Sequence, residues 1–141
     1  RLLRRIDGLV INDQEAKMLA GTDNLVRAGR AIQAMGPRFV VLKKGEHGAM
    51  FFSRDETYVM PAYPTPDVID PTGAGDSFAG GYMGFIASNG DSSPTSLKRA
   101  MAYGTVTASF TVEGFSLDRL AKIGRADIDN RYEEYRRMTA Y

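Results

Sequence analysis

The stretch with the clearest chemical character is Asp70-Pro71-Thr72-Gly73-Ala74-Gly75-Asp76, a glycine-rich loop that leads into a helical pattern. The first amides of a helix have no partners within the helix, and the macrodipole adds partial positive charge there. Such a terminus binds anions, especially phosphate. Gly73 and Gly75 let the backbone approach a ligand closely, and the small Ala74 leaves the approach open. We therefore predict that the amides of residues 73 to 76 form an anion hole.

Asp76 stands beside this predicted anion site, where a carboxylate would repel an anion. One role for it is structural, because an acid in the first helical turn stabilises the helix by roughly 0.3–1 kcal/mol. The other role is chemical: the helix terminus keeps the carboxylate ionised, so that it can take a proton from a substrate hydroxyl as a general base. The neighbouring amides would then stabilise charge on a transferring phosphoryl group. The local sequence leaves both roles open.

Small residues fill the helix that follows the loop, among them Gly80, Gly81 and Gly84. Each internal glycine costs about 1 kcal/mol relative to alanine. Three of them predict close packing against another element. A crowded buried helix would explain these glycines, but it would not explain the loop.

The elements that must position this loop are read from apolar runs and turn residues. Strands are predicted over residues 8–11, 39–42, 49–52 and 57–60, with the last two forming a hairpin. Helices are predicted over 13–20, from a cap at Asp23 or Asn24 to Gly36, and over 75–88, 94–112 and 126–139. The last helix carries so many charges that we expect mostly a solvated face. Strands early and helices late indicate the α/β class.

Composition narrows the function classes. The chain has 141 residues, enough for one domain with a hydrophobic core, and its net charge of +1 and lack of a long basic run give no indication of a nucleic-acid partner. It has no cysteine, which excludes disulfides and thiolate metal sites and is compatible with a reducing cytoplasm. No apolar stretch approaches the ~20 residues that cross a bilayer, so no membrane partner is expected. His47 is the single histidine, which makes a zinc site improbable.

The segment from Val68 to Gly81 resembles the signature of the PfkB/ribokinase family of carbohydrate and nucleoside kinases. Its core, Thr72-Gly73-Ala74-Gly75-Asp76, is intact, whereas Pro71 stands where relatives often have threonine. The resemblance extends along nearly the whole chain. It implies an α/β chain that is the C-terminal half of a ribokinase-like three-layer fold, with residues 1–141 as the nucleotide-binding and catalytic part. The N-terminal half of such kinases, which carries the lid and most acceptor contacts, is absent.

The resemblance also assigns roles outside the loop. Asn12 and Glu15 match an Asn-x-x-Glu motif that helps to hold Mg²⁺ and phosphate, often through water, although a helix cap with a first-turn acid explains the spacing equally well. Lys43 and Gly45 match a glycine turn near the nucleotide, where a solvated lysine is the alternative.

Three further positions, Tyr103, Val112 and Gly114, fall where relatives form the adenine pocket, although core packing by a helix would look the same. Asp70 and Thr72 match positions that in some relatives help to bind a monovalent cation, usually K⁺. The proline between them stiffens this loop.

The implied reaction is in-line transfer of the γ-phosphoryl group of ATP to an alcohol of a sugar or nucleoside, with Mg²⁺ as cofactor. Asp76 would deprotonate or orient the acceptor hydroxyl. A nucleotide-binding module or truncated fragment without turnover is the alternative. Without the N-terminal half, an open sheet edge and exposed apolar surface would remain, so we expect the isolated chain to form homo-oligomers or to behave poorly in solution, and its kinase activity to be weak or absent.

Two other nucleotide-binding classes fit the loop poorly. Phe78 stands where the dinucleotide-binding fingerprint requires a glycine, and no acid follows at the required distance. The Walker A pattern of P-loop NTPases is absent.

Overall fold

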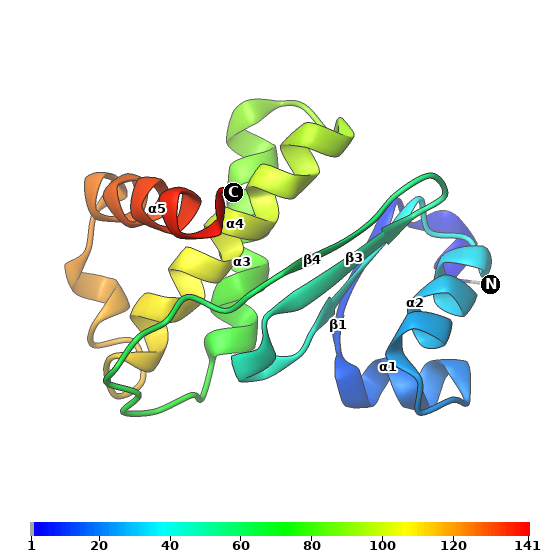
Figure 1. The fold of residues 1–141 in the computed structure, drawn as a ribbon, viewed down its shortest axis with the longest axis horizontal. Helices are drawn as coiled ribbons and strands as arrows, with labels where there is room; N and C mark the ends of the chain where they lie inside the picture. Colours follow the sequence, from blue (N-terminus) through cyan, green and yellow to red (C-terminus); the bar gives the residue numbers. More distant parts are fainter. Residues whose placement is uncertain (1) are drawn as a thin grey trace. The chain divides into compact units, whose positions relative to one another are not determined.

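Four strands pair in the order β1-β2-β3-β4 in the computed structural model, which describes residues 2–141 (Figure 1). Strands β1 (Gly8–Asn12) and β2 (Phe39–Lys43) are parallel, whereas β3 (Ala49–Ser53) and β4 (Thr57–Met60) continue the sheet as an antiparallel hairpin. Parallel strands need a crossover connection, which the helical segment between residues 13 and 34 provides. The chain is therefore mixed α/β, as the sequence predicts.

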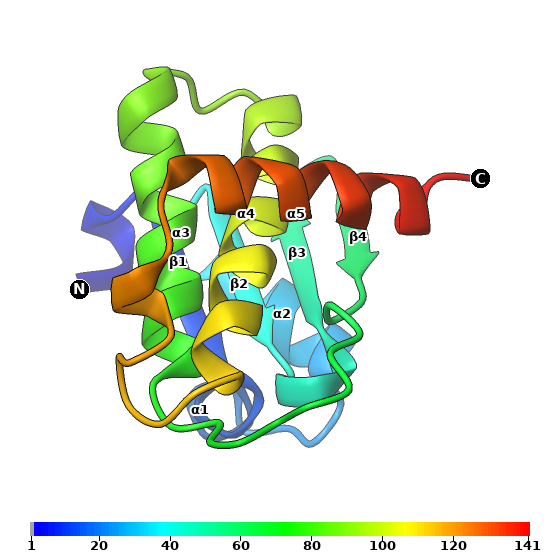
Figure 2. The same ribbon diagram turned by 90° about the vertical axis from the view of Figure 1, so that its left-hand side faces the viewer.

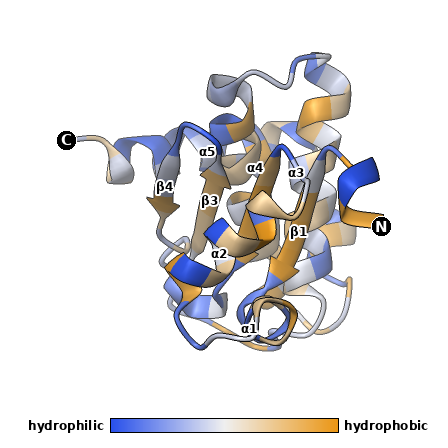
Figure 3. Cartoon of the chain, turned by 90° about the vertical axis from the view of Figure 1, so that its right-hand side faces the viewer, coloured by the Kyte–Doolittle hydropathy of each residue, from blue (hydrophilic) through white to orange (hydrophobic). Residues whose placement is uncertain are grey.

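Helices α1 (Asp13–Ala20) and α2 (Leu25–Ala34) cover one face of this sheet. Both helices contain hydrophilic and hydrophobic residues (Figure 3), and the apolar residues Met18, Leu19 and Val26 remain exposed. A fully buried core joins the two helices to the strands through Ala16, Ala28, Ile32, Val40, Leu42, Met50 and Phe52. Gly29 is required in this core, because a Cβ atom there would lie 2.3 Å from the ring of Phe52.

The secondary structure that follows β4 consists of helices and the connections between them. The backbone divides into two compact units, residues 1–61 and 62–141. The second unit contains α3 (Ala74–Asn89), α4 (Pro94–Val112) and α5 (Arg125–Thr139), with a short 3₁₀ helix at Leu120–Lys122. Helices α3 and α4 run side by side in opposite directions, and α5 packs against α4 (Figure 2). None of the helices described in residues 2–141 has the length and apolar character that a membrane crossing requires.

The spacing of α3 and α4 depends on glycines. A Cβ atom at Gly104 would lie 2.8 Å from the carbonyl oxygen of Phe78, and one at Gly81 would lie 2.5 Å from the hydroxyl oxygen of Thr107. Both distances are too short for any other residue without movement of the backbone or side chain. The close packing predicted for the α3 glycines thus holds at Gly81 but is wrong at positions 80 and 84, where a Cβ atom would meet nothing within 4 Å.

Replacing Gly104 by alanine should lower the free energy of unfolding by about 1–3 kcal/mol, because the new methyl group forces the α3 backbone away. Gly80→Ala is the matched control in α3, since its Cβ would occupy open space; it should raise stability by about 0.5–1 kcal/mol. Urea unfolding of the two variants measures both effects. Equal effects of the same sign would show that Gly104 does not set the spacing.

Candidate active site

The glycine-rich loop enters α3 through a left-handed residue. Gly73, the N-cap of α3, has φ 81° and ψ −4°, a conformation that strains a side chain with a Cβ atom. The amide of Ala74 donates to the carbonyl oxygen of Pro71 at 3.2 Å and closes a turn. The amide of Ser77 donates to the carbonyl oxygen of Gly73 at 2.9 Å and begins the helix. The loop and the helix start are therefore one continuous turn.

No side chain caps the N-terminus of α3. Within residues 2–141 the amides of Gly73 and Asp76 have no hydrogen-bond partner, and both residues are exposed. Within the predicted anion hole, the Ala74 amide is therefore engaged in the turn, whereas the amides of Gly73 and Asp76 are exposed to solvent. Unsatisfied amides at a helix N-terminus are the arrangement that binds phosphate.

Asp76 differs from the other acids at the same helical position. The carboxylate of Glu15 in α1 accepts a hydrogen bond from the Asn12 amide at 2.8 Å, and that of Asp127 in α5 accepts one from the Gly124 amide at 2.8 Å. Each acid thereby caps its own helix. Within residues 2–141 the carboxylate of Asp76 makes no hydrogen bond and no ion pair.

The backbone explains this difference. Gly124, the N-cap of α5, is extended, with φ −113° and ψ −178°, as a capping residue normally is. The left-handed Gly73 departs from this geometry, and its amide is not bound by the acid that follows. The charge of Asp76 still stabilises the helix through the macrodipole, but its carboxylate remains available to accept a proton from a substrate.

The C-terminal turn of α4 supports the loop. The carbonyl oxygen of Val112 accepts the amides of Ile69 at 2.8 Å and Asp70 at 3.3 Å. The hydroxyl of Thr111, which is buried, donates to the Ser77 hydroxyl at 2.7 Å. The residues on both sides of the glycine turn are thereby anchored to one helix end.

Asp70 folds back on its own loop, where its Oδ1 accepts the Thr72 amide at 2.9 Å. Hydrogen bonds from the Thr72 amide and hydroxyl lower the pKa of Asp70. Gly114 follows the supporting turn of α4, and its amide donates to the carbonyl oxygen of Thr111. The monovalent-cation role of Asp70 and Thr72, and the nucleotide role of Val112 and Gly114, remain predictions.

In the first unit, the carboxyl ends of β1 and β2 bring together another group of predicted residues. Asn12 pairs with Lys43 in the parallel ladder, and Gly45 begins the turn that follows β2. Glu15 is joined to Asn12 in a reciprocal capping box, because the Glu15 amide donates to Asn12 Oδ1 at 2.8 Å. Ligands of α/β proteins commonly bind at the carboxyl ends of parallel strands, so the placement suits the predicted role.

Tyr103 is not brought to the loop. Its ring is stacked between those of Phe85 and Tyr132, with centroid distances of 4.7 and 4.5 Å, and its hydroxyl donates to Asp129 at 2.8 Å. Both faces of the ring are thus covered by protein. The adenine-pocket prediction for Tyr103 has no support in this arrangement, whereas the packing alternative explains its position.

Sequence reasoning missed an ion pair at the end of α4. Arg131 donates to both carboxylate oxygens of Glu113, at 2.7 and 3.1 Å, and Thr65 adds a hydrogen bond at 3.1 Å. The last helix was predicted to be mostly solvated, which is wrong for Arg131: its side chain is 15% exposed. Arg131 lies three residues after Ile128 and four before the buried Tyr135, which places it on the same face of the helix. That spacing was the signal in the sequence that could have predicted its burial.

Comparison with known proteins adds evidence independent of this geometry. The sequence profile described as pfkB family carbohydrate kinase matches residues 1–120. The chain is 33% identical over 84 residues to a cytidine kinase of Thermococcus kodakarensis, covering 58% of this chain and 30% of that protein. It is 29% identical over 115 residues to a deoxyribokinase of Salmonella typhi, covering 78% of this chain and 36% of that protein.

Solved structures share the fold. A putative ribokinase II from E. coli, in complex with ATP and Mg²⁺, matches with a TM-score of 0.74 at 23% identity, covering 97% of this chain and 41% of that one. The chain thus spans about a third of the length of the two sequence relatives, with 30% and 36% covered.

The ion pair predicts a specific pH dependence of stability. Burial would raise the pKa of Glu113, but the hydrogen bonds and charge of Arg131, with smaller effects of Thr65 and Arg119, outweigh it and hold the pKa below its ordinary value of 4.5. A carboxyl with a depressed pKa stabilises the fold above the pKa of the unfolded chain, and this contribution disappears as the pH falls through the folded-state pKa.

Glu113→Gln should therefore lower the free energy of unfolding near neutral pH and make it fall less steeply below about pH 4.5 than in the unsubstituted protein. Chemical denaturation at a series of pH values measures this. An unchanged slope below that pH in the variant would contradict the assignment.

Proposed function

Because the chain belongs to the pfkB family of carbohydrate kinases, we propose that the whole protein transfers a phosphoryl group from ATP to a hydroxyl of a sugar or nucleoside. The observation that carries the proposal is the N-terminus of α3, where exposed amides lie beside a carboxylate that caps nothing. The relatives named as cytidine kinase and deoxyribokinase support a sugar or nucleoside as acceptor.

In the proposed reaction, Asp76 takes the proton and the amides at the start of α3 bind the transferring phosphoryl group. Asp76 accepts the proton of the acceptor hydroxyl, whose oxygen forms a bond to the γ-phosphorus as the bond to the ADP oxygen breaks. The amides of Gly73 and Asp76 donate to the oxygens of the transferring group, where negative charge is concentrated. The left-handed backbone of Gly73 holds these donors in place before the substrate arrives.

Mg²⁺ fits this chain only with partial protein coordination. Within residues 2–141 no group of three or more acidic, histidine or cysteine side chains could hold a metal. The capping box uses Glu15 Oε2, so the exposed carboxylate keeps one oxygen outside that bond. Mg²⁺ commonly keeps several waters and binds one or two carboxylates plus substrate phosphates, so Glu15 suits such a site. When bound, the ion would neutralise charge on the phosphates of ATP.

Asp76→Asn tests the general-base role directly. In the whole protein it should reduce kcat by about 10²–10⁴-fold while leaving the Kd for ATP within about threefold, because the amide side chain keeps the shape and loses the basicity. Steady-state kinetics with a panel of sugars and nucleosides and calorimetric ATP titration measure the two quantities.

Asp127→Asn is the matched control, because Asp127 occupies the same helical position in α5 after a glycine N-cap. It should cost up to about 1 kcal/mol of stability, because asparagine keeps an acceptor for the Gly124 amide but loses the favourable charge at the helix start, and it should leave kcat unchanged. Equal losses of ATP affinity and kcat in Asp76→Asn would contradict the base role. An unsubstituted protein that binds ATP without turnover on any acceptor would favour a binding module.

Glu15→Gln tests the proposed metal role without disturbing the helix, since glutamine also completes a capping box. The Mg²⁺ concentration for half-maximal activity should rise by about tenfold to 100-fold with little change in melting temperature, because loss of a carboxylate that supports a metal site typically lowers metal affinity by that factor. Asp13→Asn, which removes another charge from the same helix start, is the control. An unchanged Mg²⁺ dependence in Glu15→Gln would remove Glu15 from the metal site.

A further inference from the structure

We propose that Glu113 is a positioning residue, which holds the segment of residues 65–70 and thereby fixes the glycine-rich loop that follows. Arg131 on α5 orients Glu113, so the last helix controls the geometry of the phosphoryl site. This inference rests on the proposed function for its effect on catalysis, although the restraint itself can be tested without it.

Glu113 contacts three parts of the second unit. Arg131 of α5 binds its two oxygens at 2.7 and 3.1 Å, and Arg119 lies 3.6 Å from Oε2. The Thr65 hydroxyl donates at 3.1 Å to Oε1, the oxygen that also accepts the 2.7 Å hydrogen bond from Arg131. A carboxylate held by a bidentate arginine has a defined orientation, and it therefore presents a fixed acceptor to Thr65.

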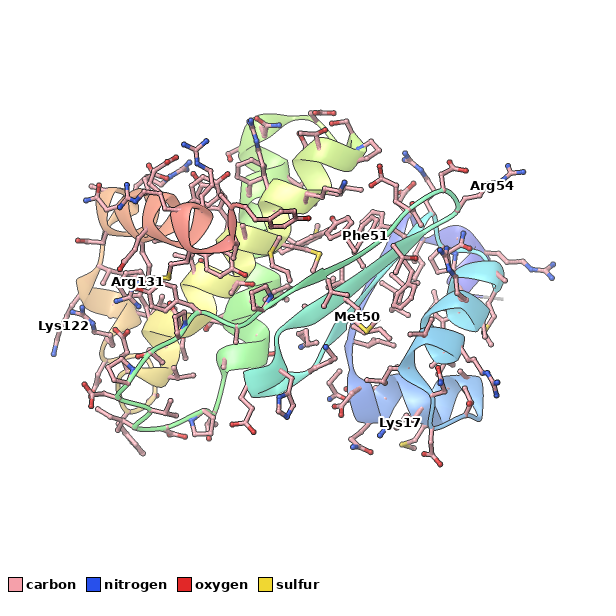
Figure 4. All side chains as sticks on the ribbon, viewed as in Figure 1. Lys17, Met50, Phe51, Arg54, Lys122 and Arg131 are labelled. Carbon is pink, nitrogen blue, oxygen red and sulfur yellow. The ribbon has the colours of Figure 1, made fainter. Side chains whose placement is uncertain are left out.

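Two aromatic rings and a hydroxyl pack against Arg131, which is labelled in Figure 4. The guanidinium carbon of Arg131 lies 3.5 Å from the ring centroid of Phe110 and 4.9 Å from that of Tyr63. Its Nη1 also donates to the Ser109 hydroxyl at 3.0 Å. With side-chain exposures of 15% and 17%, Arg131 and Glu113 are mostly shielded from water, so this pair is screened less than a surface pair.

The same helix end anchors both ends of the 65–70 segment. Thr65 binds Glu113, and the amides of Ile69 and Asp70 bind the carbonyl oxygen of the adjacent Val112. Asp70 then accepts the amide of Thr72, one residue before the left-handed Gly73. Together with the peptide bond between Val112 and Glu113, these hydrogen bonds connect α5 to the loop.

No second hydrogen bond joins Thr65 to the end of α4 among the described residues; its amide instead donates to the carbonyl oxygen of Tyr63 at 3.0 Å, and the Tyr63 hydroxyl donates to Glu134 of α5 at 2.8 Å. Pro64 and Pro66, on either side of Thr65, have no amide to donate. An open pocket of about 510 Å³ lies between the segment and the end of α4, lined by Thr65, Pro66, Asp67, Ile69, Glu113 and Arg119. Loss of the Thr65–Glu113 bond should therefore free the first half of the segment to move.

Thr65→Val removes this bond and nearly preserves the side-chain shape. In the whole protein, hydrogen–deuterium exchange over residues 67–76 should accelerate about threefold to tenfold, and kcat should fall by a similar factor while the KM for ATP changes less than twofold. Glu113→Gln should act in the same direction, because Arg131 loses its charged partner. Thr65→Ser, which restores the hydroxyl, should recover both the exchange rate and kcat.

Asp129→Asn is the control for general loosening of α5, because it breaks the Arg125–Asp129 pair on the same helix, remote in sequence from the loop. It should leave exchange over residues 67–76 unchanged. Unaltered exchange in Thr65→Val, or equal acceleration in Asp129→Asn, would overturn the proposal. Faster exchange with unchanged kcat would overturn the catalytic part. If the unsubstituted protein phosphorylates no acceptor, the proposed function fails. The exchange data then still show whether the Thr65–Glu113 hydrogen bond restrains the segment of residues 65–70.

Discussion

The left-handed backbone of Gly73 is the constraint on which the candidate site depends. It turns the chain into α3 in a way that leaves the N-terminus without a side-chain cap, although an acid stands three residues later. Two other helices with an acid at that position use it as a cap. At α3 the capping bond is absent, which leaves both unsatisfied amides and an available carboxylate. A site that must bind phosphate and accept a proton needs both.

The rest of the second unit keeps this turn in place. Glycines at 81 and 104 bring α3 close to α4, so that the Thr111 hydroxyl reaches Ser77 in the first turn of α3. The carbonyl oxygen of Val112 holds the residues before the loop, and the Arg131–Glu113 pair extends this support to α5. Catalytic groups need such supporting contacts, because small displacements of the reacting groups lower the reaction rate.

Local patterns predicted the elements closely, and long-range contacts were the part they could not predict. The predicted helix 94–112 matches α4. Of the two caps considered for α2, Asp23 and Asn24, the structure has Asn24, and Asn12 caps α1 as one of its two considered roles requires; each of these features depends on a few adjacent residues. The burial of Arg131 depends on Glu113 and Thr65, which are distant in sequence. The stacking of Tyr103 likewise needs rings from two other helices. Whether Asp76 caps its helix was open because the answer lies in the φ angle of Gly73.

The most direct test of the central claim is the response of the backbone amide resonances of the whole protein to a nonhydrolysable ATP analogue. If the start of α3 binds the transferring phosphoryl group, the amide signals of Gly73 and Asp76 shift on titration, and those of the equivalent residues of α5, Gly124 and Asp127, do not. Saturable binding of the analogue with no change at Gly73 and Asp76 would contradict the account.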